Sequence, residues 1–442
     1  MKVVLLAAGR SKRLKPIEDK NFLNFLGKPL VQIQLEQLAA AGFDDFVLVG
    51  GSHNLEKLRE LVTAMAGSRR GGAARLSMKI EVVEQENLDD GMAGAVLSAA
   101  SVASGGPVLI VSGNDIVEDS VFTKINKDEF VGAAGANDGF LVAKEVGEYF
   151  PGGYLQVENG FIKSIVEKPG AGNEPGNLVN LVIHYFKDIG PLVDALKKTA
   201  SDKDDRYEQA LDSLMKGGLK FKALPYNGFW QPIKYPWHVL AVMEHFLAGI
   251  KPKTDGAEIA ESAVIRGNVY LEDGVKVLDH ATINGPAYIG RGSIVAGNAL
   301  VRGSCIGANC VVGYATEVAR SFLGDRVWTH SNYIGDSVIG NNVSFGAGTV
   351  TGNLRFDEGN ISMNVRGEKI DSGRNKFGLI TGDHVRSGIN TSFMPGIKIG
   401  TNVCVGAGLT ISMDIENNKF VTGKTELVQH ENKLDISVIL RP

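Results

Sequence analysis

An aliphatic residue recurs at every sixth position over a long stretch of this 442-residue chain. The recurring residues are Ile259, Ile265, Leu271, Val277, Ile283, Ile289, Val295 and Val301. Four positions after each of them stand Ala263, Val269, Val275, Ala281, Ala287, Ser293, Ala299 and Cys305, most of them small. A period of six matches neither an α-helix nor an alternating strand, and it is typical of hexapeptide repeats. We therefore predict short parallel strands wound into a triangular coil, with the aliphatic side chains inside and glycines at the corners.

The repeat is interrupted further along the chain. It changes register after Cys305 and disappears between Leu354 and Gly378, and it returns at Ile399-Gly400. The interruption is rich in Asn, Arg, Lys and Glu. We interpret residues 354–378 as an arm that protrudes from the coil, and long arms on a regular scaffold commonly carry function.

The N-terminal part alternates predicted strands with predicted helices. Expected strands cover residues 2–7, 46–49, 79–83 and 108–111, and expected helices cover residues 29–41, 52–66, 94–103 and 238–247. This alternation predicts a mostly parallel, Rossmann-like α/β sheet whose ligand site lies at the carboxyl ends of its strands. We divide the chain into an α/β domain at 1–250, a linker at 251–256, a coil at 257–430 and a tail at 431–442.

Composition excludes several classes of partner. The net charge is −4 and no run of Lys and Arg exceeds two residues, so neither nucleic acid nor a membrane is an expected partner. No apolar stretch approaches the roughly 18 residues of a membrane helix. Three cysteines without metal-site spacing indicate a reducing compartment, and we expect a cytoplasmic protein.

The loop after the first strand combines small residues with cations. Leu6, Ala7, Ala8 and Gly9 precede Arg13, and Lys20 stands seven residues before Gly27-Lys28-Pro29-Leu30. Small residues let backbone N–H groups approach a phosphate, and cations beside them favour its charge. This stretch resembles the signature of the sugar-1-phosphate nucleotidylyltransferases. The resemblance implies that the loop binds a nucleoside triphosphate and that Arg13 and Lys20 stabilise the transition state at the α-phosphorus.

Later segments resemble the same family in the same order. Gln85 and the Gly91-Met92 pair resemble the segment that recognises a pyrimidine, which implies UTP or dTTP as substrate. Glu167, Lys168 and Asn180 resemble the residues that hold the sugar and its phosphate. Asp115 matches the family's Mg²⁺ ligand, a hard oxygen donor that suits this ion.

One departure concerns the expected metal site. The segment that usually supplies a second metal carboxylate has Pro232 at that position, and proline has no side-chain ligand. Asp115 alone should therefore hold Mg²⁺ weakly, unless Asn114 or Glu208 helps. A nucleotidylyltransferase domain that is catalytically impaired remains an open alternative.

Within the coil, His330, Tyr333 and Asn353 resemble residues of the acetyltransferase domain in bifunctional uridylyltransferase/acetyltransferases, with nearby sequence closer to archaeal forms. The resemblance implies a left-handed parallel β-helix in which His330 is the general base, because a neutral imidazole can accept the proton of an amino sugar as it attacks a thioester. Tyr333 and Asn353 would then bind the sugar phosphate and the reacting amine or carbonyl. Further assignments are Arg320 for the sugar phosphate and Ala347, Arg374 and Lys376 for acetyl-CoA.

We therefore predict a bifunctional enzyme of sugar-nucleotide synthesis that acetylates glucosamine 1-phosphate and joins a sugar 1-phosphate to UTP or dTTP. By the same resemblance we expect a homotrimer formed through the coil. Ser344 and Leu354 depart from the bacterial pattern, which leaves galactosamine 1-phosphate open as the substrate. The first alternative is a nucleotidylyltransferase whose coil serves only oligomerisation or regulation. The second is a non-catalytic assembly subunit built from the same domains.

Overall fold

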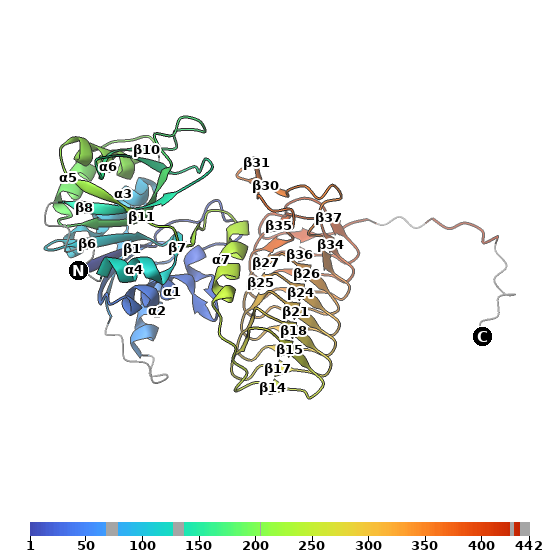
Figure 1. Cartoon of the computed structure of the whole chain (residues 1–442). Helices are drawn as coiled ribbons and strands as arrows, with labels where there is room; N and C mark the ends of the chain where they lie inside the picture. Colours follow the sequence, from blue (N-terminus) through green and yellow to red (C-terminus); the bar gives the residue numbers. More distant parts are fainter. Residues whose placement is uncertain (68–77, 127–136, 204, 425–427, 434–442) are drawn as a thin grey trace.

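The computed structural model describes residues 1–67, 78–126, 137–203, 205–424 and 428–433. Figure 1 shows two halves side by side, an N-terminal α/β half and a C-terminal coil of short strands. From residue 434 onward, the predicted tail lies outside the described residues. Among the described residues, no helix is long and apolar enough to cross a membrane.

A nine-stranded sheet forms the centre of the N-terminal half. Its order is β5 (Lys79–Gln85), β4 (Asp45–Gly51), β1 (Lys2–Leu6), β6 (Val108–Ser112), β11 (Leu178–Phe186), β8 (Gly139–Glu145), β12 (Phe221–Pro225), β10 (Phe161–Glu167) and β9 (Gly153–Glu158). The first four strands are parallel, as the alternation of strands and helices predicts. The sheet is less parallel after β6, because β11 runs antiparallel to both of its neighbours and β9 and β10 form a hairpin without a crossover helix.

Helices cover both faces of this sheet. They are α1 (Leu30–Ala40), α2 (Leu55–Gly67), α3 (Gly91–Ala103), α4 (Asp119–Asn126), α5 (Gly190–Lys198), α6 (Arg206–Lys216) and α7 (Trp237–Ala248). One buried cluster joins the sheet to α1 and α4, and a second joins its other face to α3, α5 and α6. The predicted helices and the first four predicted strands are all present, with bounds that shift by up to three residues.

The C-terminal half is a parallel β-helix with three faces. The first face consists of β16 (Val269–Leu271), β19 (Ala287–Ile289), β22 (Cys305–Ile306), β25 (Phe322–Leu323), β27 (Val338–Ile339), β32 (Ile380–Thr381) and β35 (Lys398–Ile399). The second consists of β15 (Val264–Arg266), β18 (Thr282–Asn284), β21 (Leu300–Arg302), β24 (Glu317–Ala319), β26 (Tyr333–Gly335), β29 (Val350–Thr351), β34 (Ser392–Phe393) and β37 (Thr410–Ile411). The third consists of β14 (Glu258–Ile259), β17 (Lys276–Val277), β20 (Ile294–Val295) and β23 (Val311–Val312), and then β28 (Ser344–Phe345), β33 (Arg386–Ser387), β36 (Cys404–Val405) and β38 (Phe420–Val421).

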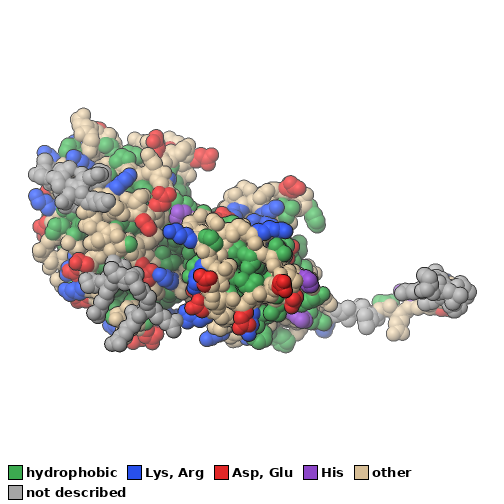
Figure 2. Space-filling model, turned by 60° about the horizontal axis from the view of Figure 1, so that its bottom comes forward, with side chains coloured by type: hydrophobic (Ala, Val, Ile, Leu, Met, Phe, Trp, Pro, Cys, Tyr) green, Lys and Arg blue, Asp and Glu red, His purple; other side chains and the backbone are tan. Residues whose placement is uncertain are grey.

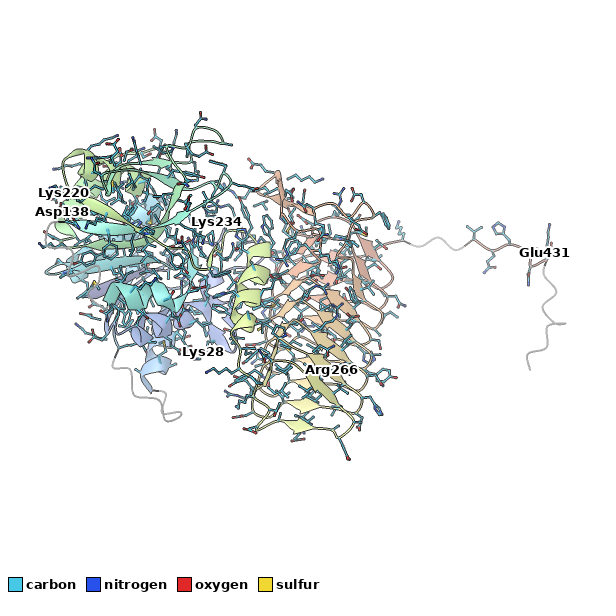
Figure 3. All side chains as sticks on the ribbon, in the orientation of Figure 1. Lys28, Asp138, Lys220, Lys234, Arg266 and Glu431 are labelled. Atoms are coloured by element: carbon cyan, nitrogen blue, oxygen red, sulfur yellow. The ribbon has the colours of Figure 1, made fainter. Side chains whose placement is uncertain are left out.

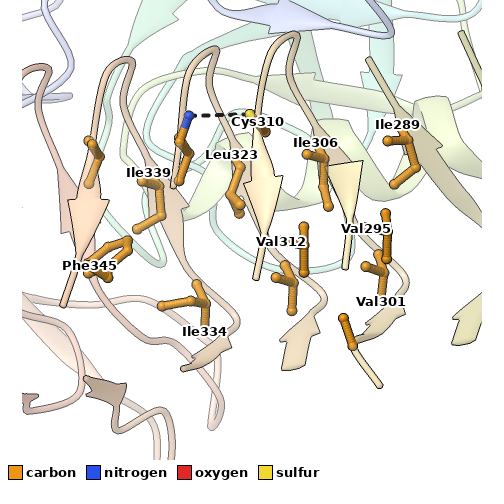
Figure 4. Packing of buried hydrophobic residues seen from close by; sticks show 14 of the residues in the cluster. Ile289, Val295, Val301, Ile306, Cys310, Val312, Leu323, Ile334, Ile339 and Phe345 are labelled. Carbon is orange, nitrogen blue, oxygen red and sulfur yellow. Dashed lines mark hydrogen bonds between the residues drawn. The ribbon is translucent and has the colours of Figure 1, made fainter. Parts of the chain in front are cut away.

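Strand pairing explains where the repeat changes register. Val264 pairs with Thr282, so one coil takes 18 residues, or three hexapeptides. The middle coils are shorter, because Leu300 pairs with Glu317 and Glu317 pairs with Tyr333, and the last coils again take 18 residues, as Ser392 pairs with Thr410. The aliphatic side chains remain inside throughout, and Figure 4 shows Ile289, Ile306, Leu323 and Ile339 along one face of the interior. The six-residue pattern therefore predicts the core correctly even where the coil length differs.

The interruption of the repeat folds as a hairpin of β30 (Ser362–Val365) and β31 (Glu368–Asp371). It lies between the two halves at one end of the coil (Figure 1). Ile361, Met363 and Phe377 are buried in the same apolar cluster as residues of α7. The predicted arm therefore packs back against the N-terminal half.

An apolar cluster joins the two halves along the first face of the coil. The rings of Phe25 and Phe322 pack at a tilt of 53° with centroids 5.1 Å apart, and Trp237 meets Phe377 edge to face at 6.4 Å. Lys253, inside the predicted linker, already pairs with Tyr270 of the coil. By contrast, the first coils leave Ile259 and Leu278 exposed, and Figure 2, turned to bring this side forward, shows hydrophobic side chains there.

Candidate active sites

A cavity of about 670 Å³ opens at the carboxyl ends of β1 and β6. Most residues predicted to bind the nucleotide and the sugar phosphate line it: Leu6, Ala8, Gly9, Arg13, Gln85, Gly91, Met92, Asp115, Glu167, Lys168 and Asn180. Ala7 lies behind this lining, where its carbonyl accepts hydrogen bonds from Asn21 and Asn54 at 2.9 and 3.0 Å. Residues spread over more than 170 positions of the sequence therefore meet at one site.

Lys20 lies directly beneath the glycine loop. It begins a short 3₁₀ helix, Lys20–Phe22, whose first turn is capped by the Asp19 side chain. A Cβ added to Gly9 would stand 3.2 Å from the Lys20 ammonium, so only glycine leaves this approach unobstructed. Burial lowers the pKa of Lys20 to about 8, although the negative charges of Asp19 and Asp115 oppose the shift. The Lys20 amine is therefore mostly protonated, and so positively charged, at pH 7.

The register of two short strands decides the surroundings of Asp115. The strand β7 (Asp115–Val117) pairs with β13 (Trp230–Pro232), which sets Pro232 directly opposite Asp115. The indole N–H of Trp230 donates to Asp115 Oδ1 at 3.0 Å. Burial raises the pKa of the Asp115 carboxyl, and the hydrogen bond from Trp230 and the charge of Lys234 oppose the shift.

These residues do not fit a Mg²⁺ ion held by the protein. Proline offers no ligand opposite Asp115, one carboxylate oxygen already accepts a hydrogen bond, and the charges of Lys20 and Lys234 act on the same carboxylate. Asn114 and Glu208 line the same cavity. Within the described part of the chain, no group of three or more His, Cys, Asp or Glu side chains could hold a metal ion. We therefore derive no catalytic step through a metal.

A buried polar network supports the sugar side of the cavity. His184 is fully buried and lies 2.9 Å from Asn180 Oδ1 through Nε2 and 2.8 Å from the Tyr207 hydroxyl through Nδ1. Burial lowers the pKa of His184 to about 3, so its imidazole is neutral. Glu167 and Lys168 form an ion pair at 2.9 Å. Sequence reasoning missed His184, because a single buried histidine carries no motif.

On the opposite side of the cavity, Gln85 supports the loop that leads into α3. Its amide nitrogen donates to the carbonyls of Asn87 and Gly91 at 2.9 and 2.8 Å. Both amide hydrogens are therefore used, and the side-chain oxygen is the group left to accept a hydrogen bond. Arg10 forms an ion pair with Asp89 at the same side, a contact that the motif does not predict.

In the coil, His330 occupies one corner between the third and second faces. Backbone hydrogen bonds join successive residues of this corner: Ser331 N to Tyr314 O at 3.1 Å, Gly348 N to Ser331 O at 3.2 Å and Asn390 N to Ala347 O at 2.8 Å. His330 and Ala347, predicted to act in acetyl transfer, therefore stand on neighbouring coils of the same corner. His330 is exposed.

The corner is fixed from within by a buried amide. Asn332 donates through Nδ2 to the carbonyls of Gly346 and Thr349 at 2.8 and 3.1 Å. Its side-chain oxygen accepts the backbone N–H of His330. The position of His330 is thus set by a residue that is itself 4% exposed.

Across β26, the other predicted sugar-phosphate residues meet at the next corner. Arg320 donates to both carboxylate oxygens of Asp336, at 2.7 and 2.6 Å. Asn353 Nδ2 donates to the Tyr333 hydroxyl at 3.2 Å and also contacts Asp336. Asp336, which sequence reasoning missed, is buried and joins all of these groups. The strand between this corner and His330 spans roughly 10 Å for its three residues.

Two residues assigned to acetyl-CoA differ in their surroundings. Lys376 is exposed and pairs with Leu354, beside Asn353. Arg374 instead donates to Glu244 of α7 at 2.7 Å, so its guanidinium takes part in the contact between the two halves. The folded-back hairpin thus directs Arg374 toward α7, and its predicted role toward coenzyme A stays a prediction.

The fold and the two sites define a two-domain transferase, with a nucleotide-binding α/β half joined to a hexapeptide coil. The family model for nucleotidyl transferases matches residues 2–233. The chain is 33% identical to the bifunctional protein GlmU of Methanocaldococcus jannaschii and 32% identical to that of Methanococcus maripaludis, over 97% of this chain and 98–99% of each relative. It is 30% identical to a bifunctional sugar-1-phosphate nucleotidylyltransferase/acetyltransferase of Sulfurisphaera tokodaii, over 95% of this chain and 99% of that one. The chain belongs to this bifunctional family, whose enzymes generally use Mg²⁺ and acetyl-CoA.

Proposed function

We propose that this chain catalyses two steps of sugar-nucleotide synthesis. The coil transfers the acetyl group of acetyl-CoA to the amine of glucosamine 1-phosphate. The N-terminal half joins UTP or dTTP to a sugar 1-phosphate and releases pyrophosphate. The observation that carries the proposal is that His330 and Ala347 occupy the same corner on neighbouring coils. The strand β26, which begins at Tyr333, leads from this corner to Arg320 and Asn353 at the next.

Acetyl transfer needs a free amine and a base to receive its proton. In the proposed reaction His330 accepts that proton while the amine nitrogen bonds to the thioester carbonyl carbon. The carbon–sulfur bond then breaks, and the thiol of coenzyme A leaves with the proton. Arg320 and Tyr333 bind the sugar phosphate, Asn353 orients the amine or the carbonyl, and Lys376 meets the phosphates of the cofactor.

Nucleotidyl transfer is mainly a matter of position and charge. A phosphate oxygen of the sugar bonds to the α-phosphorus, the bond to the bridging oxygen breaks, and pyrophosphate leaves with the negative charge. Arg13 and Lys20 meet that charge from the loop. The free oxygen of Gln85 supports a uracil or thymine base, because both carry an N–H at N3.

We further propose a homotrimer that forms through the coil. The first face is already covered by α7 and the hairpin, which leaves the other faces for contact between copies. Tyr314, at the same corner on the preceding coil, and Trp328, two residues before His330, are 57% and 59% exposed. Large apolar side chains at such exposure are typical of interaction surfaces. A second copy would thus cover the surface around His330.

The test compares thiol release from acetyl-CoA, with glucosamine 1-phosphate as acceptor, against pyrophosphate release from UTP. His330→Ala should lower kcat for thiol release by about 10²- to 10⁴-fold, the usual contribution of a general base. Pyrophosphate release should be unchanged. His280→Asn is the matched control, since His280 is an exposed corner histidine on an early coil.

The wild-type result separates the alternatives. Pyrophosphate release without thiol release would mean that the coil serves only oligomerisation or regulation. Neither activity, across several sugar phosphates, would favour a non-catalytic assembly subunit. Full thiol release by His330→Ala would remove His330 from the chemistry.

A further inference from the structure

We infer that Lys234 supplies, from the chain itself, the positive charge that a metal ion beside Asp115 would otherwise bring to the nucleotide phosphates. Nucleotide binding should then be nearly independent of divalent ions. This inference rests on the proposed nucleotidyl transfer, and it concerns the same cavity. Opposite Asp115, the partner strand has Pro232, which offers no side-chain ligand.

The backbone after β13 is held in one conformation. Pro232 stands opposite Asp115, and Ile233 N donates to Asn114 O at 2.8 Å. Lys234 N then donates to Pro232 O at 3.1 Å, which closes a tight turn just before α7. Two residues beyond the position that lacks a carboxylate, the side chain of Lys234 thus joins the lining of the cavity. Figure 3 marks Lys234 close to the start of α7.

The ammonium is held by groups that leave its charge largely uncancelled. Lys234 Nζ lies 3.3 Å from the carbonyl of Pro151 and 4.5 Å from the ring centroid of Phe150. A carbonyl dipole and an aromatic face both favour a cation without neutralising it. Among the described residues Lys234 forms no ion pair, although the charges of Asp115 and Glu167 act on its ammonium from a greater distance. These carboxylates balance its charge only in part, so the ammonium can still attract an anionic ligand in the cavity.

The other charged residues of the cavity explain why no divalent ion is needed to bind the nucleotide phosphates. Arg13 and Lys234 line the cavity with Asp115, and the Lys20 ammonium lies under Gly9. Arg13, Lys20 and Lys234 thus lie around Asp115 at the place where the phosphates of a nucleotide would bind, while Glu167 lies on the sugar side of the same cavity. These cations repel a further divalent ion, and they can neutralise a triphosphate directly. Asp115 then acts as a positioning residue that keeps Lys20 and Lys234 near the cavity.

The experiment measures UTP binding to the full chain by calorimetry, in EDTA and in millimolar Mg²⁺. Wild-type affinity in EDTA should lie within about threefold of its value in Mg²⁺, a difference of less than one kcal/mol. Lys234→Met, which keeps the length of the side chain, should weaken binding in EDTA by about tenfold or more. Lys234→Arg should keep at least half of the wild-type affinity. Lys220→Met is the matched control, because Lys220 is exposed and lies outside the cavity lining (Figure 3).

A double variant tests the reverse replacement, in which a metal ion takes the place of the lysine. Pro232→Asp combined with Lys234→Gly places a second carboxylate opposite Asp115 and removes the cation. UTP binding by this variant should improve by about tenfold or more when Mg²⁺ is added. Thermal unfolding of each variant shows whether it is folded, and the double variant carries the test if Lys234→Met does not fold.

The outcomes separate this inference from the proposed function. Wild-type binding that requires Mg²⁺, together with unchanged binding by Lys234→Met in EDTA, would overturn the role of Lys234 and leave nucleotidyl transfer standing. No binding of UTP or dTTP under either condition would overturn both. Binding in EDTA that is lost in Lys234→Met and kept in Lys234→Arg would support the inference.

Discussion

Replacing Lys20 by Met should stabilise the folded chain and strongly slow nucleotidyl transfer. Lys20 is only 6% exposed and is held beneath Gly9. Its pKa falls from 10.5 to about 8, chiefly because burial penalises the charged form. Each pKa unit corresponds to 1.36 kcal/mol, so keeping the ammonium buried at pH 7 costs about 3 kcal/mol of unfolding free energy. Methionine fills a similar volume without that charge.

The gain should disappear at high pH. Below pH 8 the lysine is charged in both the folded and the unfolded chain, so the whole cost is present. Between about pH 8 and pH 10.5 the unfolded chain binds more protons than the folded chain, and the stability of the wild type rises with pH. By pH 10 the difference between wild type and Lys20→Met should fall below about 1 kcal/mol.

Denaturant unfolding at pH 7 and pH 10 measures this difference, followed by tryptophan fluorescence in a Trp328→Phe background so that only Trp230 and Trp237 report. Lys220→Met is again the control and should match the wild type at both pH values. Pyrophosphate release by Lys20→Met should drop by about 10²-fold or more, as for loss of a charge that stabilises a transition state. A variant that is no more stable at pH 7, or equally more stable at pH 10, would refute the electrostatic reasoning.

Three further predictions concern groups around the two sites. His184→Phe should raise the KM for sugar 1-phosphate in pyrophosphate release by about tenfold, because the Asn180 side chain loses its hydrogen-bond partner. The wild-type KM should show no titration of His184 between pH 5 and 8, since the pKa of His184 is about 3. Asp336→Asn should lower the unfolding free energy by about 1–3 kcal/mol and raise the KM for sugar phosphate in thiol release, because Arg320 loses its carboxylate; normal stability in urea unfolding would contradict this. Trp328→Lys should yield monomers by light scattering that lose thiol release and keep pyrophosphate release, whereas equal loss of both would count against a site shared between copies.

Much of the fold could be predicted because its periods are explicit in the sequence. The spacing of Ile283, Ile289 and Val295 predicts the interior of the coil, and the alternation of strands and helices predicts β1, β4, β5 and β6. The antiparallel part of the sheet was not predicted, since a hairpin such as β9–β10 leaves no comparable signal. The direction of the arm was also hidden, because the burial of Met363 depends on α7, more than a hundred residues earlier.

The candidate sites likewise contain residues that the sequence predicts and residues that it does not. The loop from Leu6 to Gly9 carries a motif, so its place at the cavity could be foreseen. Asp336 and Lys234 lie inside segments that resemble the family, but the resemblance gives them no role, and their surroundings follow only from strand register and coil length. Sequence could identify the missing carboxylate at Pro232, but only the pairing of β13 with β7 shows what lies beside it.

The first face of the coil, occupied by α7, also limits how copies of this chain can be arranged. In the proposed homotrimer, contacts through the other two faces would place every nucleotide-binding half on the outside, away from the central axis. Each such half would then meet solvent independently of its neighbours, while the acetylating surfaces would be enclosed near the centre. In such a trimer, the nucleotidyl-transfer sites would face solvent, whereas the acetyl-transfer sites would lie between subunits.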